Sequence, residues 1–315
     1  MAQASRVGTL ISLAIGLSLG CVPLLGSAST CWGKVEGDLA LLEQIKLAHV
    51  SNREKLATWE GEASVETYVK RPDKLTERTA QVRFAYDRDR EAWLYHWTYV
   101  KTGEAQFDGT QLGGMVLDKA WHSYGPDLPG PDTAQGVVVQ PGSRRKIGPM
   151  TTAFDPMYYF KVRYDDLEGW IDLWRNNADT DWLSLIIDRD GDLVTVTEAN
   201  VDIPTSSARY VFDLSKGGNA VTVVGNDDVR EERWDSDYEE QAGVWVPKTV
   251  RYENRKYEGE HVSRKAVTWV RSIVNKPLAD DTFTLDAMGV VPGASIQDNR
   301  VGRRWRYKEE ELEKQ

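Results

Sequence analysis

The sequence predicts a mainly β domain in which most of the chain folds into consecutive antiparallel hairpins. Three observations lead to this class. Apolar residues recur at three- and four-residue steps in two short segments, which indicates helices. Over most of the remaining chain they alternate with polar residues, which is typical of strands with one buried face. Glycine and asparagine stand at the joints between alternating segments, where tight hairpins need positive backbone angles.

The first helix is predicted over residues 39–55, and the second begins after Asp165 and ends near Asn177. Asp38 is an N-cap candidate for the first helix, because its carboxylate can accept the free N–H groups of the first turn. Asp165 is the N-cap candidate for the second helix, and Glu168 follows three residues later, as in a capping box. The apolar stripes consist of Leu41, Leu42, Ile45, Ala48 and Leu56 in the first helix, and of Leu167, Trp170, Ile171 and Trp174 in the second.

The strands between the two helices are predicted from alternation with a period of two. The clearest case is residues 92–99, where Trp93, Tyr95, Trp97 and Tyr99 point to one face of a strand. A charged turn at residues 87–90 joins this segment to the one before it. The segments expected here are residues 62–70, 79–86, 92–99 and 113–124, the last as a single strand-like run.

Residues 125–149 contain five prolines and several glycines, so a long loop is expected there. Residues 135–140 are predicted as one short strand inside it. After the second helix the chain reads as hairpin after hairpin. The expected strands are residues 182–187, 193–199, 208–214, 220–224, 229–238, 244–254 and 261–274.

The N-terminus has the three-part pattern of a secretory signal peptide. Residues 1–6 end in one positive charge, residues 7–26 carry no charge, and small residues precede an expected cleavage after Ala28. Two alternatives remain open. The apolar run is close to the length of an uncleaved membrane anchor, and Cys21 after Gly20 resembles a lipidation site. In each case the folded part is expected outside the cytoplasm, in the periplasm or at the cell envelope.

Composition narrows the possible partners. The 315 residues include 39 Lys and Arg against 49 Asp and Glu, which gives a net charge of −10. An acidic surface repels phosphate backbones, so no nucleic-acid partner is expected. The hydrophobic fraction of 41% is that of a globular protein. No break in composition divides the chain after its N-terminal segment, which favours one domain.

Motifs for catalysis or cofactor binding are absent from the sequence, so neither an enzyme nor a cofactor is predicted. The turn at residues 188–192 is rich in aspartate, but Leu193 and Ala199 stand where an EF-hand needs glycine and glutamate. A hairpin turn explains it better than calcium. The four histidines are far apart in sequence, and no metal site is predicted from His49, His96, His122 and His261.

Large aromatic and branched side chains gather on one face of several predicted strands. They form either an ordinary core beneath the two helices or an apolar trough in a curved sheet. Tyrosine and tryptophan suit a trough, because they combine apolar area with a polar group. The candidate ligand-binding residues are Trp93, Tyr95, Trp97, Tyr99, Tyr210, Phe212, Val250, Tyr252, Val267 and Trp269.

Three segments resemble the LolA-like group of periplasmic lipoprotein carriers. Residues 52–61 (NREKLATWEG) resemble its junction between helix and first strand, residues 244–252 (VWVPKTVRY) its late hairpin, and residues 275–285 (NKPLADDTFTL) its closing segment. The resemblance implies an unclosed half-barrel with an N-terminal and a mid-chain helix against its concave face. The implied division is a signal peptide at 1–28, a linker at 29–37, the half-barrel at 38–290 and a charged extension at 291–315.

These features lead to one functional expectation and one alternative. The first is an extracytoplasmic binding or carrier protein that holds a lipid, an acyl chain or a lipoprotein anchor, with transient contact to a membrane. The alternative is a non-catalytic scaffold or sensor domain that binds a protein partner at the cell envelope.

Overall fold

A computed structural model describes residues 34–101, 109, 111–117, 120–126, 135–141, 161–162, 165–203, 205–257 and 261–308. The expected signal peptide, anchor and Cys21 lie outside these residues. So does most of the linker, of which Val35 and Glu36 form the short strand β1. Within the described residues, no helix is both long and apolar enough to cross a bilayer.

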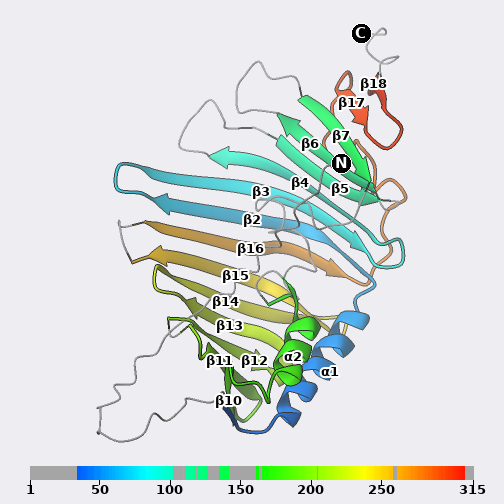
Figure 1. Ribbon diagram of the computed structural model, residues 1–315. Helices are drawn as coiled ribbons and strands as arrows, with labels where there is room; N and C mark the ends of the chain where they lie inside the picture. The colour runs from blue at the N-terminus through cyan, green and yellow to red at the C-terminus, as the bar shows by residue number, and fades with distance from the viewer. Residues whose placement is uncertain are drawn as a thin grey trace, which may run out of the picture.

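One sheet of 16 strands dominates the structure (Figure 1). Its order is β1-β10-β11-β12-β13-β14-β15-β16-β2-β3-β4-β5-β6-β7-β17-β18, so the two edge strands are different and the sheet is open. The first strands are β2 (Thr58–Lys70), β3 (Leu75–Asp87), β4 (Ala92–Lys101), β5 (Gln111–Leu117), β6 (Ala120–Pro126) and β7 (Gln135–Pro141). The later strands are β10 (Leu183–Asp190), β11 (Leu193–Asn200), β12 (Ser207–Asp213), β13 (Asn219–Asn226), β14 (Arg230–Gln241), β15 (Val244–Lys256), β16 (Val262–Val274), β17 (Ser295–Asp298) and β18 (Arg303–Arg306).

The predicted class is therefore confirmed as a mainly β, unclosed antiparallel sheet with two helices. Antiparallel ladders join all neighbours from β10 to β7, while β1 and β17 add to the sheet in parallel. A separate pair of short strands, β8 (Lys161–Val162) and β9 (Asp165–Asp166), precedes the second helix.

The two helices pack against one end of the sheet on a single face. Helix α1 (Ala40–Glu54) and helix α2 (Leu167–Asn176) lie in front of the lower strands in Figure 1. Ile45 and Ile171 are completely buried against side chains of β10–β13. Three ion pairs join the helices, namely Lys46–Asp172 at 2.6 Å, Arg53–Glu168 at 2.5 Å and Arg175–Glu43 at 2.5 Å.

Asn52 connects the end of α1 to the beginning of β15. Its side-chain amide donates to the Trp245 carbonyl at 2.9 Å, and its carbonyl accepts from the Trp245 N–H at 2.7 Å. The amide thus pairs with β15 as a neighbouring strand would. At the start of α1, the Asp38 carboxylate accepts the Ala40 N–H at 2.8 Å, as expected of a capping residue.

We call the face that the helices cover the inner face, and it continues into a second core over β2–β5, β15 and β16. Trp59 lies at the centre of this second core. Its ring stacks on Trp269 at 5.9 Å between centroids and meets Phe84 edge-on at 4.9 Å. Gly61 is required beside it, because a Cβ there would lie 2.0 Å from the Arg271 carbonyl oxygen at a bulge of β16.

The C-terminal segment covers the opposite, outer face of β3–β7. Phe283, Met288 and Ile296 are buried there against Leu94, Met115 and other side chains of these strands. β17 pairs with β7, and β18 pairs with β17. Residues 295–298 and 303–306, which lie within the expected charged extension, are therefore strands of the sheet.

Two predictions for the middle of the chain had different outcomes. The single run over residues 113–124 is wrong, since the chain turns after Leu117 and forms the hairpin β5–β6. The short strand within the proline-rich segment is confirmed as β7. Much of that segment, at 127–134 and 142–149, lies outside the described residues.

Candidate functional site

The sheet brings the ten predicted binding residues onto the inner face, but in two separate clusters. Tyr210 and Phe212 are completely buried beneath α2, where the Trp174 ring lies 5.0 Å from that of Tyr210. They belong to the helix-covered core. Tyr252 lies between the two clusters, 4.3 Å from Trp234 between ring centroids. The other seven, which belong to the second cluster, are Trp93, Tyr95, Trp97, Tyr99, Val250, Val267 and Trp269.

The aromatic side chains of β4 form the base of the second cluster. Trp93 and Tyr95 stack at 5.5 Å between centroids, and Trp97 and Tyr99 lie 5.7 Å apart. Strand β4 alternates, so these four rings point one way while Leu94 and His96 point to the outer face. We call Trp93, Tyr95, Trp97 and Tyr99 the aromatic floor. Among the described residues, no side chain of α1 or α2 belongs to this cluster.

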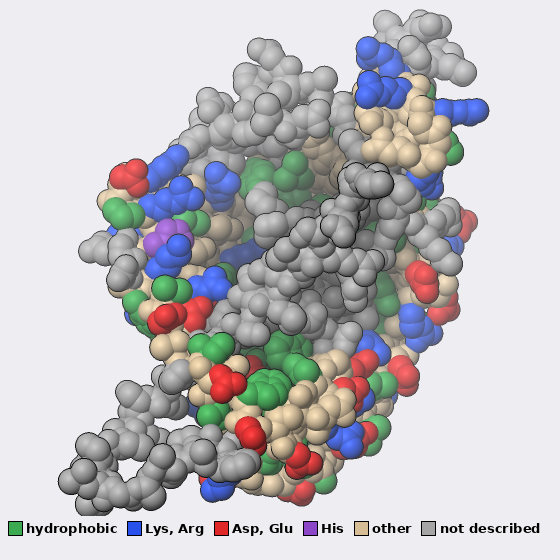
Figure 2. All heavy atoms as spheres, viewed as in Figure 1, with side chains coloured by type: hydrophobic (Ala, Val, Ile, Leu, Met, Phe, Trp, Pro, Cys, Tyr) green, Lys and Arg blue, Asp and Glu red, His purple; other side chains and the backbone are tan. Residues whose placement is uncertain are grey.

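Figure 2 shows the inner face as a recess. Green hydrophobic side chains lie back from the rim where this face is visible, and blue Lys and Arg side chains border it over the left ends of β2, β3, β15 and β16. Arg78, Lys256 and Lys74 are exposed residues in this part of the chain. The protein as a whole carries a net charge of −10. The border is thus a local basic region on an acidic protein.

Lys265 is a basic residue that lies beside the aromatic floor. Its Nζ lies 6.0 Å from the centroid of the Trp97 ring, although β16 and β4 are separated by β2 and β3. Such a contact across two intervening strands requires a strongly curved sheet. Burial lowers the pKa of Lys265 to about 8, because desolvation disfavours the charged ammonium.

Two residues flank this lysine in the same row of the sheet. Thr67 of β2 is opposite Lys265, and Arg78 of β3 is opposite Thr67. Opposite residues of antiparallel strands share a face, so all three point inward. Arg78 also hydrogen-bonds the Tyr99 hydroxyl at the end of the aromatic floor. Burial raises the pKa of Tyr99, and the Arg78 charge opposes that change.

On the other side of Lys265 the row continues into a polar network. Tyr252 is opposite Lys265, and its hydroxyl donates to Glu232 at 3.3 Å. Asn254 donates to the same carboxylate oxygen at 2.8 Å, and Arg230 lies 3.3 Å from it. Glu232 is buried, with an exposed fraction of 4%, and these groups satisfy its charge.

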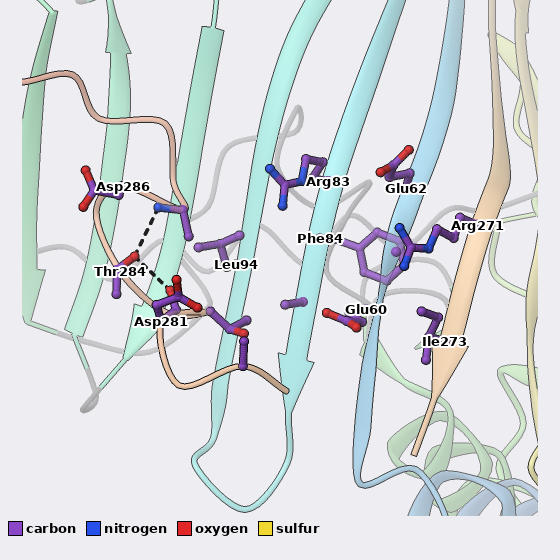
Figure 3. Close-up of a pocket in the computed structure, with 15 residues that line it drawn as sticks. Glu60, Glu62, Arg83, Phe84, Leu94, Arg271, Ile273, Asp281, Thr284 and Asp286 are labelled. Atoms are coloured by element: carbon purple, nitrogen blue, oxygen red, sulfur yellow. Dashed lines mark hydrogen bonds between the residues drawn. The ribbon is translucent and has the colours of Figure 1, made fainter. Parts of the chain in front are cut away.

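A pocket of about 530 Å³ lies on the outer face, between the sheet and the C-terminal segment (Figure 3). Its lining mixes Arg83 and Arg271 with an excess of acidic groups, and Thr284 fixes the local turn through the Asp281 carbonyl at 2.9 Å. Apolar residues such as Phe84, Leu94 and Ile273 also line it, but its six charged residues make it less suited to an alkyl chain than the inner face. The acidic residues are Glu60, Glu62, Asp281 and Asp286.

Metal-ligating side chains do not gather within the described part of the chain, where no group of three or more His, Cys, Asp or Glu residues is placed to hold an ion. His96 and His122 are both partly buried, and burial lowers the pKa of each. No catalytic arrangement is evident from these two side chains.

Sequence reasoning missed the cationic row of Arg78 and Lys265. The signal was present, because Lys265 has the same strand parity as Val267 and Trp269 and so had to share their face. The proximity of Lys265 to Trp97 had no such signal in the sequence. It depends on how the sheet curves from β16 through β2 and β3 to β4.

Comparison with known proteins gives a likeness in fold. No protein-family model matches the chain, and no curated protein matches it. A DUF1329 family protein from Desulfovibrio piger is 14% identical, with a TM-score of 0.43 over 78% of this chain and 98% of that one. An outer membrane lipoprotein-sorting protein domain from Vibrio parahaemolyticus is 12% identical, with a TM-score of 0.44 over 80% and 100%. The neighbours thus include a protein of the kind that the sequence resembles, and at these identities the likeness concerns the fold alone.

Proposed function

We propose that this protein is an extracytoplasmic binding or carrier protein that holds the alkyl chain of a lipid, an acyl group or a lipoprotein anchor against its inner face. The single observation that carries the proposal is the aromatic floor of β4. It lies on the curved face of the sheet, in a cluster to which neither helix contributes a side chain among the described residues.

The driving force is the removal of apolar surface from water. The rings of the aromatic floor are only 2–8% exposed, so the gain comes mainly from the ligand. Each Å² of alkyl surface removed from water contributes about 25 cal/mol, less the ordering of the chain and of the side chains that receive it. Tryptophan and tyrosine supply large contact area with few rotatable bonds, so little side-chain entropy is lost on binding. The lining of the outer pocket contains no tryptophan or tyrosine, and six of its residues are charged.

The cellular location belongs to the same proposal. The N-terminal sequence has the features of a secretory signal, and a carrier for alkyl chains is needed where they cross an aqueous space between membranes. Loading and release then take place during transient contact with a membrane. The role is binding rather than catalysis, and no cofactor is required for it.

The second candidate is a scaffold or sensor that binds a protein partner. The observation that favours it is the complete filling of the inner face over β10–β13 by α1 and α2, which shows that this fold can close part of its concavity with its own helices. The two functions differ in whether the chain takes up an apolar ligand at all.

Native mass spectrometry of the protein purified from its own compartment, followed by organic extraction, tests the proposal. We expect a reproducible bound species that is extracted as a lipid or acyl compound. A clean apo mass, with no uptake of added decanol, would contradict the carrier function and favour the scaffold.

Substitutions in the aromatic floor test the location of the ligand. We expect Trp93→Ala combined with Trp97→Ala to reduce decanol binding by about tenfold or more, because two large apolar contacts are lost. Trp305→Ala is the matched control, since Trp305 is 46% exposed on β18 and lies outside the inner core. Near-ultraviolet circular dichroism checks the fold, and Trp97→Leu replaces the double variant if that one unfolds. Unchanged binding in a folded variant would remove the aromatic floor from the site.

A further inference from the structure

We propose that the ligand is an anionic amphiphile, whose carboxylate or phosphate head is bound by Arg78 and Lys265 above Thr67 while its alkyl chain lies on the aromatic floor. This inference rests on the proposed function and adds the chemical class of the ligand. The evidence is the row of three side chains, the position of two described cations beside the aromatic floor, and the direction in which the apolar surface runs.

The row places two cations at a suitable separation for one anion. Arg78, Thr67 and Lys265 lie opposite one another on three adjacent strands. Neighbouring strands are about 4.8 Å apart, so the two cations start about 10 Å from each other. Both side chains are long enough to converge on a group above the threonine, whose hydroxyl can donate to an anionic oxygen. An arginine fork matches the two oxygens of a carboxylate or phosphate, and an ammonium adds a point charge.

The surroundings strengthen such an interaction. Lys265 is only partly exposed and lies beside the Trp97 ring, where water is partly excluded. Electrostatic attraction is larger in such a site than in bulk water. The lowered pKa of Lys265 is consistent with this, because it shows that the ammonium is incompletely solvated in the free protein.

The described residues place two cations beside the aromatic floor. Glu232 is the nearby acidic side chain in the adjoining row of β14, and Arg230, Asn254 and Tyr252 already satisfy it. Arg230 also lies 3.3 Å from Asp227. Among the described residues, Arg78 lies beside Tyr99 and Lys265 beside Trp97, so both cations adjoin the aromatic floor and complement an anion.

The apolar surface begins in the next row and runs away from the cations. Val65 and Val267 lie two residues further along β2 and β16, and Ala63 and Trp269 follow. Each step of two residues advances about 6.8 Å. A ligand with its head above Thr67 therefore places its first methylene groups beside Val65, and later ones over the tryptophans.

Isothermal titration calorimetry with four ten-carbon probes tests this assignment. The probes are decanoate, decyl phosphate, decanol and decyltrimethylammonium, and the proteins are the full mature chain and its variants Lys265→Met, Arg78→Gln and Arg264→Met. Arg264→Met is the matched control, because Arg264 is the neighbour of Lys265 on β16 but stacks over Tyr68 on the outer face. Thermal unfolding of each variant confirms that it is folded.

We expect an anionic probe to bind at least about tenfold more tightly than decanol, and the cationic probe to bind most weakly. Lys265→Met and Arg78→Gln should each remove most of this preference, with a much larger loss of affinity for the anionic probes than for decanol, while Arg264→Met retains the preference. The stronger of decanoate and decyl phosphate identifies the head group as carboxylate or phosphate.

Two results would overturn the assignment, and they are distinguishable. Equal affinities for decanol and both anions, unaffected by the two inner-face substitutions, would leave the carrier function standing and refute the anion site. Loss of affinity in Arg264→Met equal to that in Lys265→Met would show general charge attraction and also refute it. Failure of all four probes to bind would instead contradict the proposed function itself.

Discussion

Lys265 places an ammonium group on the same face as Val267 and Trp269, beside an indole ring. Burial lowers the pKa of this lysine from 10.5 to about 8. Between those values the unfolded chain binds more protons than the folded chain, so the free energy of unfolding rises with pH across this window. Below pH 8 the lysine is charged in both the folded and the unfolded chain. The free energy of unfolding is then lowered by the full cost of desolvating the ammonium group.

Replacement of this lysine by methionine should therefore stabilise the protein. We expect Lys265→Met to raise the free energy of unfolding at pH 7 by about 1–3 kcal/mol, since the charge is removed and the apolar stem is retained. Urea unfolding at pH 7 and at pH 10 measures the effect, which should shrink at the higher pH. Arg264→Met should change stability by less than about 0.5 kcal/mol. A lower stability of Lys265→Met at pH 7 would show that the ammonium stabilises the fold.

Helix α1 depends on one side chain for its contact with the late hairpin. Asn52 supplies both a donor and an acceptor to Trp245, which no apolar side chain can do. The bounds of α1 and α2 differ from the predicted ones by a residue or two. The position of α2 over Tyr210 and Phe212 had no local signal, since it depends on which strands become neighbours.

The substitution Asn52→Ala should lower the free energy of unfolding by about 2–3 kcal/mol, because two hydrogen bonds are lost and the Trp245 backbone groups lose their partner. Asn177→Ala is the comparison, since that amide donates one exposed bond to the Leu173 carbonyl at 2.7 Å. Urea denaturation of both variants gives the difference. Equal losses would mean that the contact with β15 adds nothing to an ordinary exposed hydrogen bond.

The molecule as a whole has apolar cores on both faces of its sheet. The alternating pattern predicted the inner core well, because period two marks one buried face. It did not predict the outer core, which forms only because the C-terminal segment returns to β7. The short, charged sequence of β18 resembles a tail, and its pairing with β17 is a consequence of tertiary structure.

Loss of packing beneath the C-terminal segment should affect the entire domain. We expect Ile296→Ala to lower the free energy of unfolding by about 2–4 kcal/mol, because Ile296 is 1% exposed and the substitution leaves a cavity. Ile203→Ala is the matched control, since that side chain is 40% exposed. Thermal and urea unfolding measure both. An equal, small effect would show that the outer core forms independently of β17.

The pairing of β2 with β16 has a consequence for how the chain reaches its native state. Val65 and Val267 meet there although they are about 200 residues apart, whereas the other antiparallel pairs of the sheet join consecutive strands. Each arm of the sheet, β2–β7 and β10–β16, is therefore a meander that can form from local contacts. Joining the arms closes a long loop at a large entropic cost, so we expect this seam to form slowly and late in folding. The aromatic floor lies on one side of the seam and Lys265 on the other, so the proposed site is assembled only when the arms meet.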